Sequence, residues 1–247
     1  MIKIITLITK FIIVTLIALL FASCNHMINM KSIEGSGHVT TEKRIVQGDF
    51  KNVEVSNTID LVIEQSNKIE IIVEADDNLQ KEITAKVENG VLIIACDYNS
   101  FNNIKSKKVT VKMPVIEGLE ASSAATIKSS HTLKGENIKL ESSSAASIDL
   151  NIEFDTIYSE ASSGSTININ GKALQLNTEA SSGSTINAKD LLANDIKAEA
   201  SSGSTINVHP IVSLDAEASS GSTVSYNTVP KSIRKEENSA GSIHQEQ

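Results

Sequence analysis

The sequence is poor in the residues that build disulfide scaffolds and stacking sites. It has no tryptophan, three tyrosines, five phenylalanines and two cysteines, Cys24 and Cys96, in 247 residues. Two cysteines cannot supply the disulfide framework of a small secreted scaffold. Scarce aromatic residues leave few platforms for stacking sugars. Acidic residues outnumber basic ones 30 to 22, and this balance argues against nucleic acid or anionic lipid as partners.

The N-terminal apolar run has the features of a targeting signal. Lys3 and Lys10 supply positive charge, and an almost unbroken apolar stretch of about a dozen residues follows, whereas a membrane span needs about 20. The stretch ends in "LFASC", which resembles a bacterial lipobox with Cys24 as the lipidated first residue. We therefore expect residues 1–24 to be a lipoprotein signal peptide. An uncleaved N-terminal anchor is the alternative.

The residues after Cys24 predict where the protein resides. Asn25 follows the cysteine, without the aspartate that would favour retention at an inner membrane. We expect an outer-membrane lipoprotein that faces the periplasm or the cell surface. Residues 25–40 are polar and lack periodicity, which is typical of a flexible tether. Cys96 lies in the apolar run "GVLIIACDY" and is predicted to be a small buried residue, not a catalytic thiol.

One polar phrase, "EASSGSTINI" from Glu160, returns at a spacing of 18 to 21 residues. Self-similarity at this period indicates a solenoid, in which each repeat forms one turn, or rung. The copies align on their glutamates, with a degenerate last copy that we align on Glu237. The aligned residues are Glu120, Glu141, Glu160, Glu179, Glu199 and Glu217.

Alternation within each copy indicates strands. Around Glu179 one parity is apolar or small and is expected to face inward: Leu174, Leu176, Thr178, Ala180, Ser182, Ser184, Ile186 and Ala188. A period of two is typical of strands, and the stacked rungs then form a parallel β-helix. We expect regular rungs and a C-terminal cap over residues 119–247.

Small residues suit the narrow interior of such a β-helix. Inward serine hydroxyls can form hydrogen bonds along the stack. Glycines at 164, 183, 203 and 221 are expected where each rung bends. Alanine occupies this position at Ala124 and Ala145, so a positive φ is not expected to be obligatory.

Residues 41–118 are rich in strands without this period, and Asn89-Gly90 is predicted to form a hairpin turn. The segments "GDFKNVEVSNTIDLVIEQ", "VEADDNLQKEITAKVENGVLII" and "VTVKMPVIEGLEASSAATI" occur in order. In this they resemble the auto-transporter adhesin head GIN domain family, over about residues 43–227. The resemblance implies an all-β, right-handed β-helical fold on an exported bacterial protein, often lipid-anchored, and brings no catalytic residues.

Candidate binding residues lie on the outward parity. The acidic ladder of Glu141, Glu160, Glu179, Glu199 and Glu217 is the first, with Thr185 and Asn187 beside it. A solvated face is the simpler interpretation, and Ca²⁺ binding by the ladder is the alternative. No catalytic residue, metal ligand set or cofactor is predicted, because His131, His209 and His244 are scattered.

Two functions remain open from the sequence. The first is a non-enzymatic, membrane-anchored adhesion or interaction module that binds a glycan or an envelope or surface protein. The second is a structural spacer or assembly unit without a dedicated ligand. Self-association at the end of the stack is also expected if the charged segment "KSIRKEE" caps it poorly.

Overall fold

Strands form all the regular structure in the described part of the chain. A computed structural model describes residues 31–98 and 100–246, and residues Ser32–Gln247 form one compact unit. Cys24 lies outside the described residues. The strands of the first half are β1 (Ser32–Glu34), β2 (Val39–Arg44), β3 (Asn52–Val55), β4 (Asp60–Gln65), β5 (Glu70–Asp76), β6 (Ile83–Glu88), β7 (Val91–Cys96), β8 (Ser100–Asn102) and β9 (Lys107–Met113).

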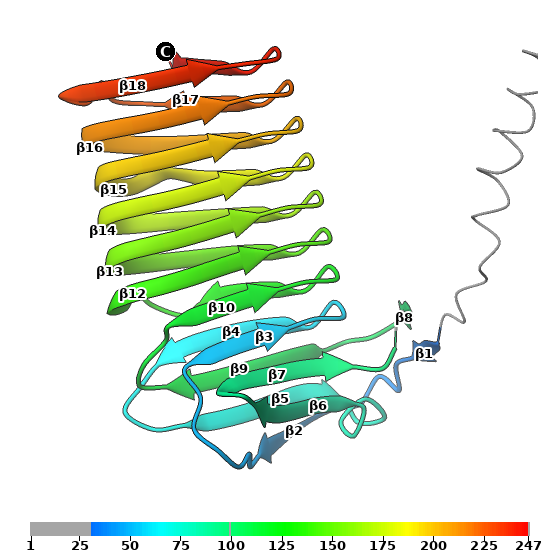
Figure 1. Cartoon of the computed structure of the whole chain (residues 1–247). Helices are drawn as coiled ribbons and strands as arrows, with labels where there is room; N and C mark the ends of the chain where they lie inside the picture. The colour runs from blue at the N-terminus through cyan, green and yellow to red at the C-terminus, as the bar shows by residue number, and fades with distance from the viewer. Residues whose placement is uncertain (1–30, 99, 247) are drawn as a thin grey trace, which may run out of the picture. The chain divides into compact units, whose positions relative to one another are not determined.

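The second half contains the long strands. They are β10 (Gly118–Ala121), β11 (Thr126–Ser129), β12 (Leu133–Ser142), β13 (Ser147–Ala161), β14 (Thr166–Ala180), β15 (Thr185–Ala200), β16 (Thr205–Ala218), β17 (Thr223–Tyr226), β18 (Ser232–Glu237) and β19 (Ser242–Gln245). Each pairs in parallel with the next rung, and the rungs stack as in Figure 1. The predicted all-β parallel solenoid is confirmed.

A tight turn joins the two sides of each rung and repeats along one edge of the stack (Figure 1). In the copy at Glu179, Ser182 and Gly183 have φ of 52° and 70°, and the Ser184 amide donates to the Ser181 carbonyl at 3.2 Å. Two successive positive φ values define a type I′ turn. The Gly183 amide then donates to the Ser202 carbonyl of the next rung at 3.0 Å, so the turns are hydrogen-bonded to each other.

The expectation that a positive φ is not obligatory where alanine replaces the turn glycine is wrong. Ala124 and Ala145 have φ of 58° and 61°, because the bond from each turn amide to the next rung fixes the same geometry whatever the residue. Gly171 has a stricter requirement. Its φ is 127°, and a Cβ there would lie 2.0 Å from the carbonyl oxygen of Ile152.

The interior contains the predicted inward row with two exceptions. Leu176, Thr178, Ala180, Ser184, Ile186 and Ala188 are buried. Ser182 is exposed because it lies in the type I′ turn, where side chains leave the strand alternation. Leu174 is exposed and Ala173 is buried instead, since two consecutive outward residues at the far corner shift the alternation by one position.

The solenoid begins earlier than the repeat in the sequence. Strand β3 pairs in parallel with β10, and Glu54 lies opposite Glu120. Strand β4 pairs likewise with β11. The turn between β3 and β4 has φ of 58° at Asn57 and 57° at Thr58. "EVSNTIDL" is therefore a divergent copy of "EASSGSTI".

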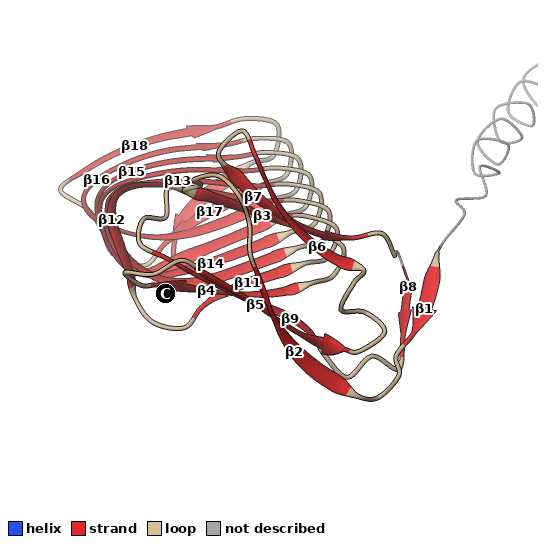
Figure 2. Cartoon of the chain, turned by 90° about the horizontal axis from the view of Figure 1, so that it is seen from below, coloured by secondary structure: helices blue, strands red, loops and turns tan. Residues whose placement is uncertain are grey.

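Antiparallel strands adjoin this first rung, as seen in Figure 2. β7 and β9 extend the parallel stack by pairing with β3 and β4. β6 then pairs antiparallel with β7 through the predicted Asn89-Gly90 turn, which has φ of 51° and 80°. β5 pairs antiparallel with both β9 and β2. Strand β1 lies within residues 25–40, the segment expected to be tether, and pairs in parallel with β8.

The last rung differs from the sequence alignment by one residue. Glu217 lies opposite Glu236, and Ala218 lies opposite Glu237. Glu236 therefore continues the glutamate alignment, and the assignment to Glu237 is wrong. The turn that follows fixes this register, because Ser239 and Ala240 have φ of 47° and 62° and so match Ser220 and Gly221. A glutamate thereby replaces an inward alanine.

Candidate functional site

The aligned glutamates form one straight row on the surface. Parallel pairing places them side by side from rung to rung, and the row is longer than the predicted acidic ladder. We call the full set the glutamate row: Glu54, Glu120, Glu141, Glu160, Glu179, Glu199, Glu217 and Glu236. Rungs are about 4.8 Å apart, so unit charges on adjacent rungs repel by about 0.9 kcal/mol in water.

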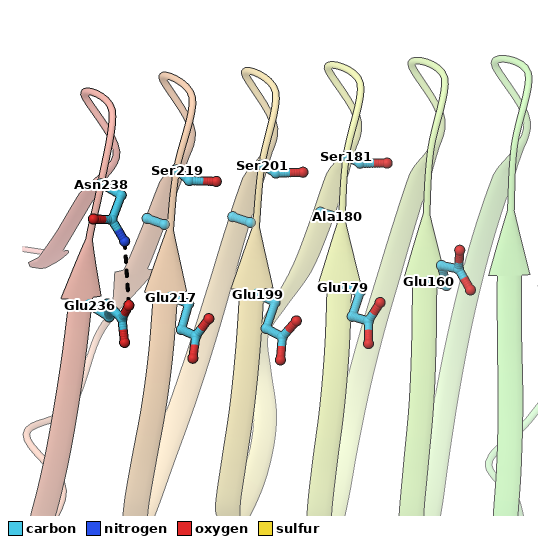
Figure 3. Close-up of a pocket in the computed structure, with 12 residues that line it drawn as sticks. Glu160, Glu179, Ala180, Ser181, Glu199, Ser201, Glu217, Ser219, Glu236 and Asn238 are labelled. Carbon is cyan, nitrogen blue, oxygen red and sulfur yellow. Dashed lines mark hydrogen bonds between the residues drawn. The ribbon is translucent and has the colours of Figure 1, made fainter.

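A shallow groove runs along the C-terminal part of this row. Figure 3 shows the glutamate side chains on one side and Ser181, Ser201 and Ser219 on the other. The floor consists of the small residues Ala180, Ala200 and Ala218, and the volume is about 280 Å³. A second stretch of about 90 Å³ continues past Glu120, Glu141, Ser142, Ser143, Glu160 and Ser162. We call both stretches together the glutamate groove.

The groove is chemically repetitive because each rung contributes the same set of groups. A carboxylate and a serine hydroxyl recur in the "EAS" of successive rungs, on either side of an alanine whose side chain faces the interior. Asn238 replaces the serine in the last rung, where its amide donates to Glu236 at 3.4 Å. Such a surface accepts hydrogen bonds at regular intervals. It therefore suits an extended ligand more than a compact one.

Basic residues neutralise part of the row. Lys139 pairs with Glu141 at 2.8 Å and Lys197 with Glu199 at 2.5 Å. The hydrogen bond to its glutamate raises the pKa of each lysine. Arg234 contacts Asp215, Glu217 and Glu236 at 2.8, 2.9 and 3.3 Å. These pairs leave the middle of the groove the most acidic part.

Glu160 and Glu179 occupy this middle part. Both side chains are exposed, and no ion pair within residues 31–98 and 100–246 involves either of them. Glu120 lies at the other end of the groove. Glu120 is exposed, but partial desolvation by its neighbours raises the pKa of Glu120, and the carboxylates of Glu54 and Glu141 raise it further. The glutamate row therefore has two adjacent carboxylates without ion pairs, Glu160 and Glu179, in the middle of the groove, and a partly desolvated carboxylate, Glu120, near its N-terminal end.

Thr185 and Asn187 do not join this groove. They follow the turn on β15 and lie on the other side of the rung. The Asn187 amide donates to Asn168 Oδ1 at 2.9 Å, and Asn187 Oδ1 accepts from Asn207 at 2.6 Å. Ser225 continues this row by donating to Asn207 Oδ1 at 2.6 Å. The side chain of Asn187 is thus engaged in a stack of amides that joins the rungs.

The described residues offer no constellation for metal binding. Within residues 31–98 and 100–246, no three His, Cys, Asp or Glu side chains lie close enough together to hold an ion. The glutamates form a line, whereas Ca²⁺ needs six to eight converging oxygens. The geometry therefore gives no support to the Ca²⁺ interpretation of the acidic ladder.

The three histidines and Cys96 lie in four different parts of the fold. His131 lies 2.8 Å from the Ser130 hydroxyl and 3.2 Å from the Gln65 carbonyl. His209 contacts the Lys189 carbonyl at 3.2 Å, and His244 is exposed on β19. Cys96 is buried, and burial raises the pKa of its thiol. A thiol with a raised pKa is a poor nucleophile.

Comparison with known proteins agrees with the fold. A family model described as "Putative auto-transporter adhesin, head GIN domain" matches residues 49–230. Comparison with curated proteins finds no match to this sequence. Within the described ranges, no helix has the length and apolarity needed to cross a bilayer.

Solved structures share the architecture at low identity. A putative adhesin from Bacteroides fragilis has a TM-score of 0.80 at 19% identity, covering 87% of this chain and 100% of that chain. A putative lipid binding protein from Parabacteroides distasonis has a TM-score of 0.72 at 20% identity, covering 88% and 100%. A putative adhesin from Parabacteroides merdae has a TM-score of 0.69 at 18% identity, covering 88% and 100%. At such identities the likeness establishes the fold alone.

Proposed function

The chain belongs to the family described as putative auto-transporter adhesin, head GIN domain, and from this premise we propose that it is a non-enzymatic adhesion module of the cell envelope. The partner is an extended surface glycan or an envelope or surface protein. The observation that carries the proposal is the glutamate groove, where one set of groups repeats at every rung on one face.

Repetition gives this groove a physical advantage in adhesion. A single exposed ion pair or hydrogen bond contributes only about 0.2–1 kcal/mol. A linear partner that lies along the groove repeats such a contact at successive rungs, and linked contacts add avidity. The unpaired carboxylates of Glu160 and Glu179 favour a partner that presents ammonium or hydroxyl donors.

We further propose that lipidation of Cys24 holds the module at the outer membrane, facing the periplasm or the cell surface. Only residues 25–31 separate Cys24 from β1. A fully extended chain of that length reaches about 25 Å. Labelling cells with an alkyne-tagged fatty acid tests the anchor, since Cys24→Ala should abolish both labelling and membrane association. Membrane association that persists without Cys24 would instead favour an uncleaved N-terminal anchor.

A binding screen tests adhesion directly. The full chain in detergent would be applied to arrays of bacterial and host glycans and matrix proteins, with and without Ca²⁺. The double variant Glu160→Gln/Glu179→Gln should weaken any saturable binding, and the loss should resemble the effect of high salt. Asp149→Asn/Asp155→Asn is the matched control, because it removes the same charge from exposed sites outside the groove. Equal loss in both pairs would contradict a role of the groove.

The alternative is a structural spacer or assembly unit, and the amide stack through Asn187 favours it. In this stack the outward polar side chains form hydrogen bonds between rungs and are not free to bind a partner. This function predicts that wild-type protein binds nothing in the screen. It also predicts that groove substitutions are tolerated by cells, whereas inward substitutions such as Ile186→Asp are not.

A further inference from the structure

A recess lies on the outward face where the long rungs begin. Strand β12 pairs with β10 only from Lys139 onward, so its earlier residues have a rung on one side alone. The chain between β9 and β10 crosses this gap. The Gln65 amide bridges the two parts by donating to the carbonyls of Pro114 and Lys134 at 3.2 and 2.8 Å. A cavity of about 530 Å³ remains there, which is within the usual size of a small-molecule site.

Apolar groups form much of the recess. Ile116 and Ile138 are buried in its wall. Gly135 lies against the buried ring of Phe154, where a Cβ at Gly135 would lie 2.5 Å from that ring. Tyr158 and Val115 line the same recess and are 49% and 45% exposed. Phe154 and Tyr226, the other aromatic residues of the repeats, are buried, so Tyr158 alone among these three presents a free ring.

Free hydrogen-bonding groups surround the Tyr158 ring. Asn137 and Glu136 line the recess with exposed side chains. No hydrogen bond or ion pair joins either side chain to any other described residue. The side chain of Asn187, by contrast, both donates and accepts a hydrogen bond. Tyr158 lies opposite Lys139 in the parallel register. Asn137 precedes Lys139 by two residues on the same outward face, and so lies diagonally beside the ring.

The charges in the recess disfavour an anionic ligand. Both lysines of the lining are already paired, Lys139 with Glu141 and Lys134 with Glu153, each at 2.8 Å. Glu117 is paired with Lys51 at 2.6 Å. Glu136 is therefore the unpaired charge of the lining within the described residues. It would repel an anion, but it would accept hydrogen bonds from hydroxyl groups.

We propose that this recess binds a neutral pyranose unit of a glycan. The apolar C–H face of the sugar packs on the Tyr158 ring. The side-chain oxygens of Asn137 and Glu136 accept hydrogen bonds from sugar hydroxyl groups, and the Asn137 amide donates a hydrogen bond to a sugar oxygen. The proposal rests on the proposed adhesive function, for which it names a ligand class. The recess is nevertheless separate from the exposed centre of the glutamate groove, so the two can be tested independently.

Saturation-transfer NMR and calorimetry on the full chain in detergent test the proposal. The probes are methyl glycosides of glucose, galactose, mannose and N-acetylglucosamine, with methyl glucuronide as the anionic comparison. At least one neutral glycoside should bind. Tyr158→Ala should weaken it about tenfold, which corresponds to about 1.4 kcal/mol, because the sugar loses its aromatic contact. Tyr158→Phe should retain most of the affinity, and Asn137→Ala should lose several-fold.

Two controls make the outcomes separable. Circular dichroism checks folding, which the half-exposed Tyr158 should not affect. Asp149→Asn/Asp155→Asn, at exposed sites outside both the recess and the glutamate groove, should leave glycoside binding unchanged. Absence of binding, preference for the glucuronide, or full affinity in Tyr158→Ala would overturn the pyranose site. A wild-type dimer that Tyr158→Ala dissociates would also overturn it, because a second copy would then occupy the recess. Binding of a polymer that only the groove variant weakens would preserve adhesion and reject this site.

Discussion

The hydroxyl of Ser184 donates a hydrogen bond to the main-chain oxygen of Ala161, 2.8 Å away on the preceding rung. The same oxygen atom of Ser184 accepts from the Ser181 amide at 3.2 Å. Each hydroxyl thus links its own turn to the rung before. The relationship recurs at Ser165, Ser204 and Ser222. The small residues of the repeat therefore form hydrogen bonds between rungs as well as filling a narrow interior.

The serine series predicts opposite effects of two single-atom changes. Ser184→Ala should cost about 1 kcal/mol of unfolding free energy, because a buried hydrogen bond between rungs is lost. Ala146→Ser should gain up to about 1 kcal/mol, because Ala146 occupies the same turn position and a new hydroxyl would face the carbonyl of Ala121. Urea titration followed by circular dichroism measures both. A stability unchanged in both variants would show that these hydroxyls contribute packing only.

Strain in the first turn predicts a stabilising substitution. Thr58 has a φ of 57°, which disfavours a β-branched residue, and its buried hydroxyl has no partner among the described residues. Thr58→Gly should therefore raise the unfolding free energy by about 1–2 kcal/mol. Ala145→Gly should gain less, since Ala145 has a φ of 61° but no hydroxyl to bury. Thermal unfolding ranks the two, and an equal or lower melting temperature for Thr58→Gly would contradict the argument.

The raised pKa of Glu120 predicts that replacing this residue stabilises the protein in a pH-dependent way. Partial desolvation of Glu120, together with the carboxylates of Glu54 and Glu141, disfavours its charged form, so ionised Glu120 destabilises the fold. Glu120→Gln should raise the melting temperature at neutral pH. The gain should be complete above the folded-state pKa and should disappear as the pH falls below the ordinary value of 4.5. A gain that does not depend on pH would mean that packing, not charge, is responsible.

The lowered pKa of Asp76 predicts that its contribution to stability depends on pH in the opposite sense. Burial raises the pKa of Asp76, but backbone hydrogen bonds from Ser106, Gly37 and Lys105 outweigh it, so the pKa is lowered overall. The donor distances are 3.0, 2.9 and 2.9 Å. Stability from this carboxylate is complete above its ordinary value of 3.8 and is lost as the pH falls through the lower folded-state value.

Asp76→Asn should therefore cost about 2 kcal/mol at pH 7, because an amide replaces a charged acceptor of three bonds. The cost should shrink as the pH falls through the lowered folded-state pKa of Asp76, where the wild type also loses its charge. Hydrogen exchange of the Gly37 and Ser106 amides would locate the effect. Protection that is the same in both proteins would contradict the role assigned to Asp76.

The sequence predicts the repeating parts of this molecule better than its ends. Period-two alternation and the recurring "SSGS" set the strands and the turn positions because every rung has the same neighbours. Glu54 escaped detection because "EVSNTIDL" carries larger side chains than the later copies. The partners of Asp76 and the free ring of Tyr158 depend on contacts between residues distant in sequence, which no local pattern contains.

The end of the stack carries charges in interior positions. Lys235 lies opposite the inward Ala216, and Glu237 lies opposite the inward Ala218. The Lys235 ammonium donates to the Tyr226 hydroxyl at 2.8 Å and lies 4.7 Å from the centre of its ring. The Glu237 carboxylate accepts from the Ile243 amide. Strand β18 is exposed along its whole length and pairs with β16 alone among the described strands.

Inward charges at a strand edge oppose the addition of another strand. Lys235→Ala/Glu237→Ala restores the alanines of the preceding rung and should permit end-to-end association, visible as a rise in mass with concentration in analytical ultracentrifugation. Arg234→Ala/Glu236→Ala is the matched control, since it removes the same charges from the outward positions of the same strand and should remain at the wild-type mass. Association of the control alone, or of both pairs equally, would show that net surface charge, not the charges placed over the open end, keeps the molecules apart.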